Sequence, residues 1–121
     1  MDQPQLGNIA ALINLIRQDP AHVGVHPQAP LDLEEAAVHL GRDDAGVSLR
    51  FLDAAEGTVR QLAKHPELGR LRRYRHAWLR GVRSLAVRGF DQHLVLYRPT
   101  SNGIEVLRVL HGARDLPEQQ A

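Results

Sequence analysis

The sequence contains no cysteine, which excludes disulfide bonds and thiolate metal sites. Aromatic residues make up only 4% of the chain, so a core must be built mainly from leucine, valine and alanine. The most apolar run, Ile9–Ile16, is too short to span a bilayer and is interrupted by Asn14. The first residues lack the cationic segment of a secretory signal. These absences favour a soluble protein of the cytoplasm.

The chain does contain enough apolar material for one core. Its 121 residues are 43% hydrophobic, which is typical of a single folded domain. The formal net charge of +1 conceals an uneven distribution. Residues 1–69 hold five basic and ten acidic side chains, whereas residues 70–121 hold ten arginines and four acidic side chains. This asymmetry indicates an acidic partner for the second half, unless the two halves fold together and neutralise each other.

Helical periodicity dominates the first half of the sequence. Residues 28–41 and 44–64 form two amphipathic segments, separated by Asp43 and Asp44, which supply a break and an N-cap. Their apolar stripes are Leu33, Ala36, Ala37 and Leu40 in the first segment, and Phe51, Leu52, Ala55, Val59 and Leu62 in the second. The pattern predicts an antiparallel helical hairpin.

An additional helical segment is predicted ahead of this hairpin, in residues 1–20. Its apolar residues share one helical face, which is expected to pack against another part of the protein. They are Leu6, Ile9, Leu12, Ile13 and Ile16. We expect residues 1–20 to be an extension and residues 21–121 to form one domain.

Short stretches with strand character flank the hairpin. Residues 22–26 precede it, and residues 79–87, 93–98 and 104–111 follow it. Gly89 with Asp91, and Asn102-Gly103, mark tight turns between the last three, which predicts an antiparallel meander. The expected fold class is α+β: an N-terminal strand, an antiparallel helical hairpin and a three-stranded antiparallel meander, with an extra N-terminal helical segment.

Six motifs follow one another between His22 and Leu116. They are D-L-E-E-A-A-V-H-L, S-L-R-F-L-D-A-A-E, H-P-E-L-G-R, L-R-G-V-R-S-L-A-V-R-G-F, H-L-V-L-Y-R-P and V-L-H-G-A-R-D-L. Each motif is weak alone, but their order and spacing resemble the RelE/ParE superfamily of toxins from bacterial type II toxin–antitoxin systems. The ParE branch is the most similar. That resemblance implies an inhibitor of DNA gyrase that a cognate antitoxin neutralises.

The RelE branch of the superfamily implies a different chemistry, ribosome-dependent cleavage of messenger RNA. Such a site needs cations around the scissile phosphate, together with groups that activate the ribose hydroxyl and protonate the leaving oxygen. In the RelE pattern an arginine follows an aromatic residue where this chain has His93-Leu94. Arg114 matches the basic residue after the last strand, but no tyrosine follows it. The resemblance therefore implies a protein that is not an enzyme. The alternatives are an mRNA interferase with His111 and Arg114 as catalytic groups, or a non-toxic antitoxin-binding module.

Arginines form the main candidate partner-binding set. Those on or beside the strands, Arg80, Arg83, Arg88, Arg98 and Arg108, are predicted to line one open sheet face, where guanidinium groups would bind antitoxin carboxylates. The hairpin covers only one side of a small sheet, which would leave the other side open to a helix or strand of a partner. The predicted partner-binding residues are Arg73, Arg75, Arg80, Arg83, Arg98, Arg108, His111 and Arg114.

Several of these residues have structural alternatives. Arg72, Arg73 and Arg75 flank Tyr74 and His76, an interleaving found in nucleic-acid binders and equally in solvated loops. His111 would otherwise end a strand bonded to backbone, and Arg114 would pair with Asp115 or a helix carboxylate.

Two further residue types point to structure rather than to a site. A tyrosine in the middle of a strand, such as Tyr97, is more often part of the core than of a contact surface. The seven histidines show neither the helical spacing nor the cysteine neighbours of a dedicated metal site. We therefore expect neither a metal ion nor another cofactor, and the expected partners are a cognate antitoxin and DNA gyrase.

Overall fold

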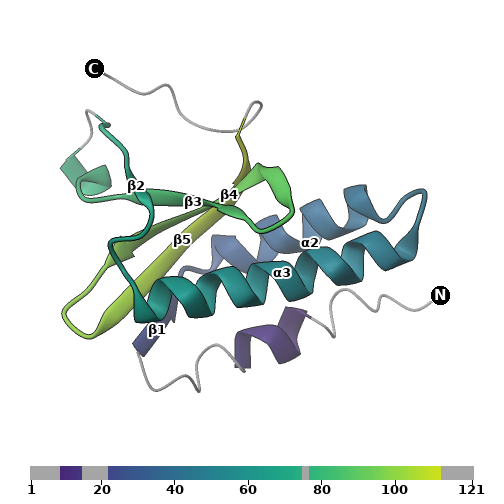
Figure 1. Ribbon diagram of the computed structural model, residues 1–121, viewed down its shortest axis with the longest axis horizontal. Helices are drawn as coiled ribbons and strands as arrows, with labels where there is room; N and C mark the ends of the chain where they lie inside the picture. Colours follow the sequence, from purple (N-terminus) through teal and green to yellow (C-terminus); the bar gives the residue numbers. More distant parts are fainter. Residues whose placement is uncertain (1–8, 15–21, 75–76, 113–121) are drawn as a thin grey trace.

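Two long helices pack on one face of a five-stranded sheet in the computed structural model (Figure 1). The structure describes residues 9–14, 22–74 and 77–112. Its elements are β1 (His22–Val25), α2 (Gln28–Leu40), α3 (Ala45–Lys64), β2 (Arg70–Leu71), the 3-10 turn η1 (Ala77–Leu79), β3 (Arg83–Val87), β4 (Phe90–Pro99) and β5 (Gly103–His111). No helix among these residues has the length and apolar character of a membrane span.

The sheet has the strand order β1-β5-β4-β3-β2. Its centre is the predicted antiparallel meander of β3, β4 and β5. β1 joins one edge parallel to β5, pairing His22 with Gly103 and Val25 with Val106. A β-carbon at Gly103 would collide with the backbone carbonyl of His22, so this parallel pairing requires glycine there. β2, which the sequence did not indicate, covers part of the other edge.

The helical hairpin follows the predicted pattern closely. The five predicted stripe residues of α3 are all buried, and in α2 Leu33 and Ala37 are buried while Ala36 and Leu40 pack partly buried against them. Asp44 caps α3, because its carboxylate accepts a hydrogen bond of 2.8 Å from the backbone N–H of Gly46. The amphipathic stripes therefore identified both the helices and the faces they bury.

Three details of the strand prediction were wrong. The strand expected over residues 93–98 begins at Phe90, so Asp91 lies in β4 and not in the turn before it. The strand expected over residues 79–87 begins only at Arg83, because η1 and Gly81 with its positive φ of 78° turn the chain before it. The hairpin between β4 and β5 does exist, but its two central residues are Ser101 and Asn102. The backbone N–H of Thr100 donates to the carbonyl of Gly103, which already belongs to β5.

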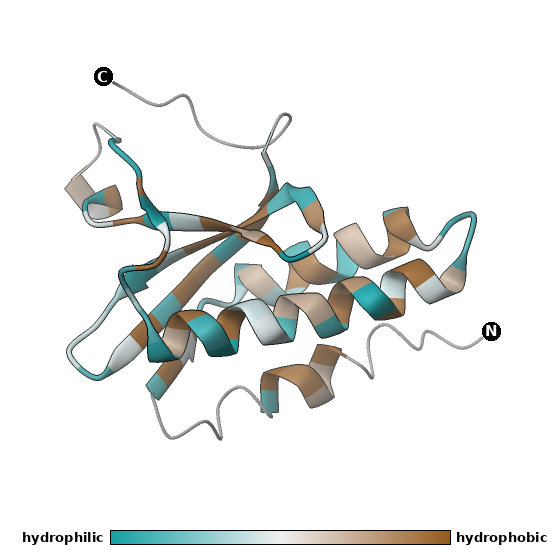
Figure 2. Ribbon diagram, in the orientation of Figure 1, coloured by the Kyte–Doolittle hydropathy of each residue, from teal (hydrophilic) through white to brown (hydrophobic). Residues whose placement is uncertain are grey.

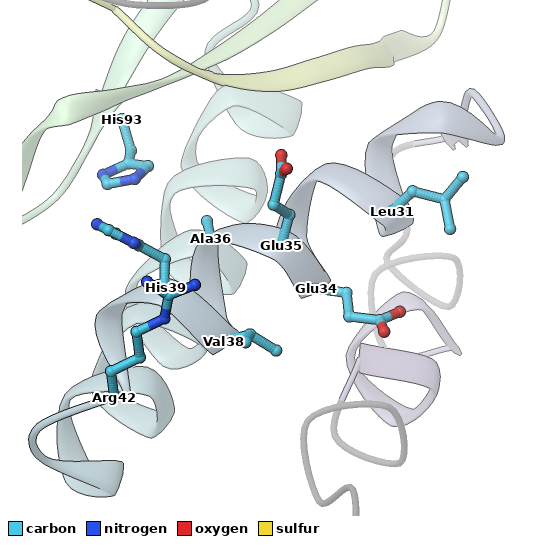
Figure 3. A pocket seen from close by; sticks show the side chains of 8 residues that line it. All are labelled: Leu31, Glu34, Glu35, Ala36, Val38, His39, Arg42 and His93. Carbon is cyan, nitrogen blue, oxygen red and sulfur yellow. The ribbon is translucent and has the colours of Figure 1, made fainter.

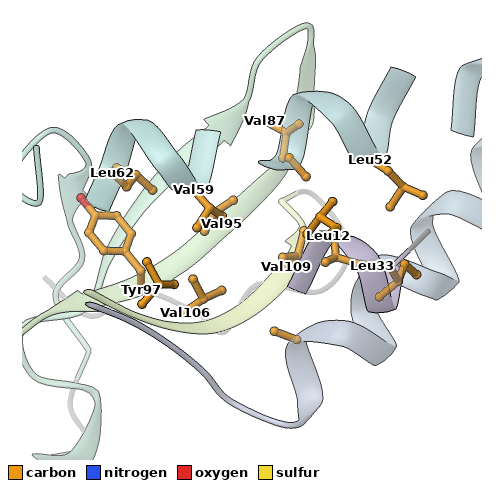
Figure 4. Close-up of a cluster of buried hydrophobic side chains, with 14 of the residues drawn as sticks. Leu12, Leu33, Leu52, Val59, Leu62, Val87, Val95, Tyr97, Val106 and Val109 are labelled. Atoms are coloured by element: carbon orange, nitrogen blue, oxygen red, sulfur yellow. The ribbon is translucent and has the colours of Figure 1, made fainter. Parts of the chain in front are cut away.

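The main core lies between the hairpin and the sheet, and residues 9–14 contribute to it. Those residues are helical and mostly apolar (Figure 2), and Ile9 and Leu12 are buried among side chains of α2, α3 and the sheet. Figure 4 shows Leu12 close to Leu33 and Val109. The predicted packing of this apolar face is confirmed for the described part. Leu6 and Ile16 lie outside the described residues.

Candidate functional site

The face of the sheet opposite the helices carries a second, smaller apolar cluster, here called the open-face cluster. Its buried members are Leu79, Val82, Leu96 and Leu110, and Tyr74, Leu94 and Leu107 pack against them partly buried. Neighbouring residues of a strand point to opposite faces, so Leu96 lies here while Tyr97 enters the main core. The segment between β2 and β3 supplies Tyr74, Leu79 and Val82 and covers only part of the face. Leu94 and Leu107 are only partly buried, so apolar surface remains accessible on this face.

Arginines lie beside the open-face cluster and are held by the protein itself. The Nε of Arg72 donates to the hydroxyl of Ser84 at 2.8 Å. The Nε of Arg98 donates to the backbone carbonyl of Arg80 at 3.1 Å, and its guanidinium lies 3.8 Å from Glu105. Arg73 and Arg80 are exposed. The fixed guanidinium groups provide positive charge around an apolar patch, an arrangement suited to an acidic amphipathic segment.

Tyr74 is a polar member of this cluster. Its hydroxyl is buried and makes no hydrogen bond with any residue that the structure describes. Burial raises the pKa of Tyr74, and the nearby charge of Arg72 offsets part of that rise. Tyr74 therefore stays protonated at neutral pH.

The predicted common face for all the strand arginines is wrong. Arg83 pairs across the strands with Tyr97, so it lies on the helix-facing side, whereas Arg98 lies on the open side. The Nη1 of Arg83 donates to the backbone carbonyls of Glu67 and Gly69, at 3.2 and 2.8 Å. Among the predicted residues that the structure describes, Arg98 and Arg80 contact each other at the open face, through the guanidinium of Arg98 and the backbone carbonyl of Arg80.

Arg108 contacts α2 rather than a free surface. Its guanidinium forms a bidentate pair with Asp32, at 2.7 Å from Nε and 3.0 Å from Nη2. Asp32 is buried and also accepts the backbone N–H of Val109 at 3.0 Å. β1 stops short of this stretch of β5, so Asp32 occupies the strand edge that would otherwise be unpaired.

His111 lies at the helix-facing end of the sheet, away from the arginines of the open face. Its ring packs edge-on against that of His93, with centroids 5.3 Å apart. His93 in turn packs against Phe51, at 5.1 Å, and is buried. This packing does not place His111 with the open-face arginines, and Arg75 and Arg114 lie outside the described residues.

A groove of about 450 Å³ runs along the outer flank of α2 (Figure 3). His39 and His93 point toward one another at one end of it, beside Arg42. The remaining lining residues are Leu31, Glu34, Glu35, Ala36 and Val38. No group of three or more His, Cys, Asp or Glu side chains in the described ranges is placed to hold a metal ion.

The open-face leucines are the part of the site that the sequence analysis missed. The signal was present, because H-L-V-L-Y and V-L-R-V-L-H are apolar on consecutive residues rather than on alternate ones. Such runs indicate strands that are covered on both faces. The arginines were recognised by residue type alone, which does not reveal the side of the sheet.

The architecture is that of small α+β toxins, in which a helical hairpin packs on one side of a largely antiparallel sheet. A family model described as the ParE toxin of the type II toxin–antitoxin system parDE matches residues 23–116. The chain therefore belongs to the ParE toxin family.

One solved structure with the same fold is titled "Chromosomal ParDE TA system from P. aeruginosa". It has a TM-score of 0.58 and 19% sequence identity, over 74% of this chain and 92% of that one. A comparison with curated proteins gives no match.

Proposed function

We propose that this ParE-family toxin inhibits DNA gyrase and is neutralised by a cognate antitoxin that docks on the open face of the sheet. The observation that carries the docking site is the open-face cluster with its held arginines. The solved structure with the same fold comes from a ParDE toxin–antitoxin system, which supports an antitoxin as partner.

The chemistry of the open face favours docking over RNA cleavage. Leu94, which stands where the RNA-cleaving branch would have an arginine, packs in the apolar cluster opposite Leu110. A scissile phosphate there would meet hydrocarbon, which cannot stabilise the charge of a transition state. The fixed guanidinium groups of Arg72 and Arg98 suit carboxylates on a protein partner.

Inducible expression and a supercoiling assay test the two parts of the proposal. We expect expression of the full chain to arrest growth, and co-expression of the antitoxin from the adjacent gene to restore it. The purified chain should inhibit supercoiling by gyrase and leave ribosome-bound transcripts intact. Growth arrest with normal supercoiling would reject gyrase as the target, and an absence of growth arrest would reject toxicity.

A pair of matched variants tests the docking site. Leu94→Asp places a charge in the open-face cluster, whereas Leu49→Asp places one on the exposed side of α3. We expect the first to weaken antitoxin binding at least about tenfold and the second to leave it unchanged, measured by calorimetry. If circular dichroism shows that both variants are folded and their affinities for the antitoxin are equal, the proposal that the antitoxin binds this face is rejected.

A further inference from the structure

The outer flank of α2 carries an exposed stripe that is both apolar and charged. Leu31 and Val38 are 57% and 47% exposed, and their seven-residue spacing places them on one helix face. Glu35 lies one turn after Leu31 and Arg42 lies one turn after Val38, so both continue the same line. We call this surface the α2 stripe: Leu31, Glu34, Glu35, Val38, His39 and Arg42.

The charge of the α2 stripe changes sign along the helix. Glu34 and Glu35 make its first part acidic, and Arg42, which follows His39, makes its last part basic. None of these four side chains forms an ion pair with another residue of the described ranges, where the pairs are Arg60–Glu56, Arg98–Glu105 and Arg108–Asp32. When two copies of this surface face each other in opposite directions, the acidic part of each copy meets the basic part of the other.

We propose that the α2 stripe binds a second copy of this chain, with the two α2 helices antiparallel about a two-fold axis. In such an interface residue i faces residue j, and j faces i. An axis level with the peptide bond between Ala36 and Ala37 sets Leu31 opposite Arg42 of the second copy, and Glu35 opposite Val38 of the second copy.

The same register also covers the exposed apolar side chains of the stripe. Leu31 covers the aliphatic stem of Arg42 of the second copy, whose guanidinium then reaches the acidic part of the stripe one turn away. Val38 lies over the stem of Glu35 of the second copy. A parallel arrangement would instead put like charges together at both ends of the stripe.

The size of the stripe sets the strength of the complex. α2 has 13 residues, and a single helix of that length buries less than the roughly 1,600 Å² of a standard interface. The dimer is therefore weak and reversible, with a dissociation constant in the micromolar range. It is also sensitive to salt, because the facing charges are near solvent.

Two charge-inverted variants of the full chain test the proposal by sedimentation velocity across the micromolar range. Glu34→Lys with Glu35→Lys makes the stripe wholly basic, and His39→Glu with Arg42→Glu makes it wholly acidic. We expect each variant alone to self-associate at least about tenfold more weakly than the wild type, because like charges meet at both ends. An equimolar mixture of the two should associate again, because a basic stripe then faces an acidic one.

The control inverts charges on α3, with Arg50→Glu and Asp53→Lys, and should dimerise like the wild type. Circular dichroism establishes that all variants are folded. A monomeric wild type throughout the concentration range overturns the proposal, as does a mixture of the basic and acidic variants that stays monomeric. Loss of antitoxin binding in those variants without any self-association would assign the stripe to the antitoxin instead.

Discussion

At the scale of single residues, Tyr97 of the Y-R pair connects β4 to the H-P-E-L-G motif by hydrogen bonds. Its ring is fully buried, as the sequence analysis expected. Its hydroxyl donates to the carbonyl of Pro66 at 2.7 Å and accepts the backbone N–H of Gly69 at 2.8 Å. A β-carbon at Gly69 would overlap the Tyr97 ring, which accounts for glycine at that position. The motif therefore holds the segment between α3 and β2 against β4.

Removing the Tyr97 hydroxyl tests how much these hydrogen bonds stabilise the protein. Tyr97→Phe leaves the Gly69 N–H buried without its acceptor, and we expect a loss of about 1–3 kcal/mol in the free energy of unfolding. Tyr74→Phe is the matched control, because the Tyr74 hydroxyl has no hydrogen-bond partner among the described residues, and it should change stability little. Urea denaturation measures both. Equal losses in the free energy of unfolding for the two variants would show that the Tyr97 hydrogen bonds do not stabilise the protein.

The same variant alters stability at alkaline pH. Burial raises the pKa of Tyr97, and the Gly69 N–H and the charge of Arg83 offset part of that rise. The pKa of Tyr97 is therefore higher in the folded than in the unfolded chain. The stability that this difference contributes is fully present below the unfolded pKa of about 10, and it is lost as the pH rises through the folded pKa. Tyr97→Phe should therefore flatten the alkaline fall in stability relative to the wild type, measured by urea denaturation at neutral and at alkaline pH.

At the scale of elements, the sequence predicted what depends on local periodicity and missed what depends on distant contacts. The hairpin α2–α3 and the meander were predictable because their apolar residues repeat with the period of a helix or a strand. β2 has only two residues and so has no period to recognise. The parallel pairing of β1 with β5 depends on Gly103, whose role is set by the approach of His22 and not by its neighbours in sequence.

The segment 9–14 is an element that lies outside the family match, which begins at residue 23. We propose that residues 1–20 add a helical layer to the domain formed by residues 21–121. Leu12 is 5% exposed and, together with Ala29 and Ala55, lines a small apolar space of about 10 Å³ between this segment and the hairpin. Its burial indicates that the segment adds to the core of the domain.

Truncating Leu12 tests the contribution of this layer. Leu12→Ala should lower the free energy of unfolding by about 2–4 kcal/mol, because the surrounding side chains cannot close the cavity fully. Asn14→Ala, at an exposed position of the same segment, should have an effect below about 0.5 kcal/mol. Chemical denaturation of both full-length variants gives the comparison. A similar small change for both would mean that the segment does not stabilise the domain.

At the scale of the whole molecule, the acidic and basic halves of the chain meet at only one described ion pair. Arg108 and Asp32 join the sheet to the helical layer across 76 residues of sequence. The other described pairs lie within one half each. Among the described residues, neutralisation between the two halves therefore occurs at this pair. The sequence contained both residues, but no local pattern shows that Asp32 turns inward and Glu35 outward.

The Asp32–Arg108 pair should be a main determinant of stability, because it connects the two layers and also closes the free edge of β5. Asp32→Ala removes both hydrogen bonds to Arg108 and leaves the Val109 N–H without its acceptor. We expect a loss of about 2–3 kcal/mol, less than for a fully buried pair because the Arg108 side chain is 41% exposed and can reach water.

The matched control for this pair is Glu35→Ala, which removes a carboxylate of the same helix that makes no described ion pair. Its effect should be below about 0.5 kcal/mol at a protein concentration where the chain is monomeric. Urea denaturation of the two variants and of Arg108→Ala, combined in a double-mutant cycle, isolates the coupling between Asp32 and Arg108. The coupling should persist at high salt, because the buried carboxylate is poorly screened. Equal stability of Asp32→Ala and Glu35→Ala would mean that the two layers are held together by apolar packing alone.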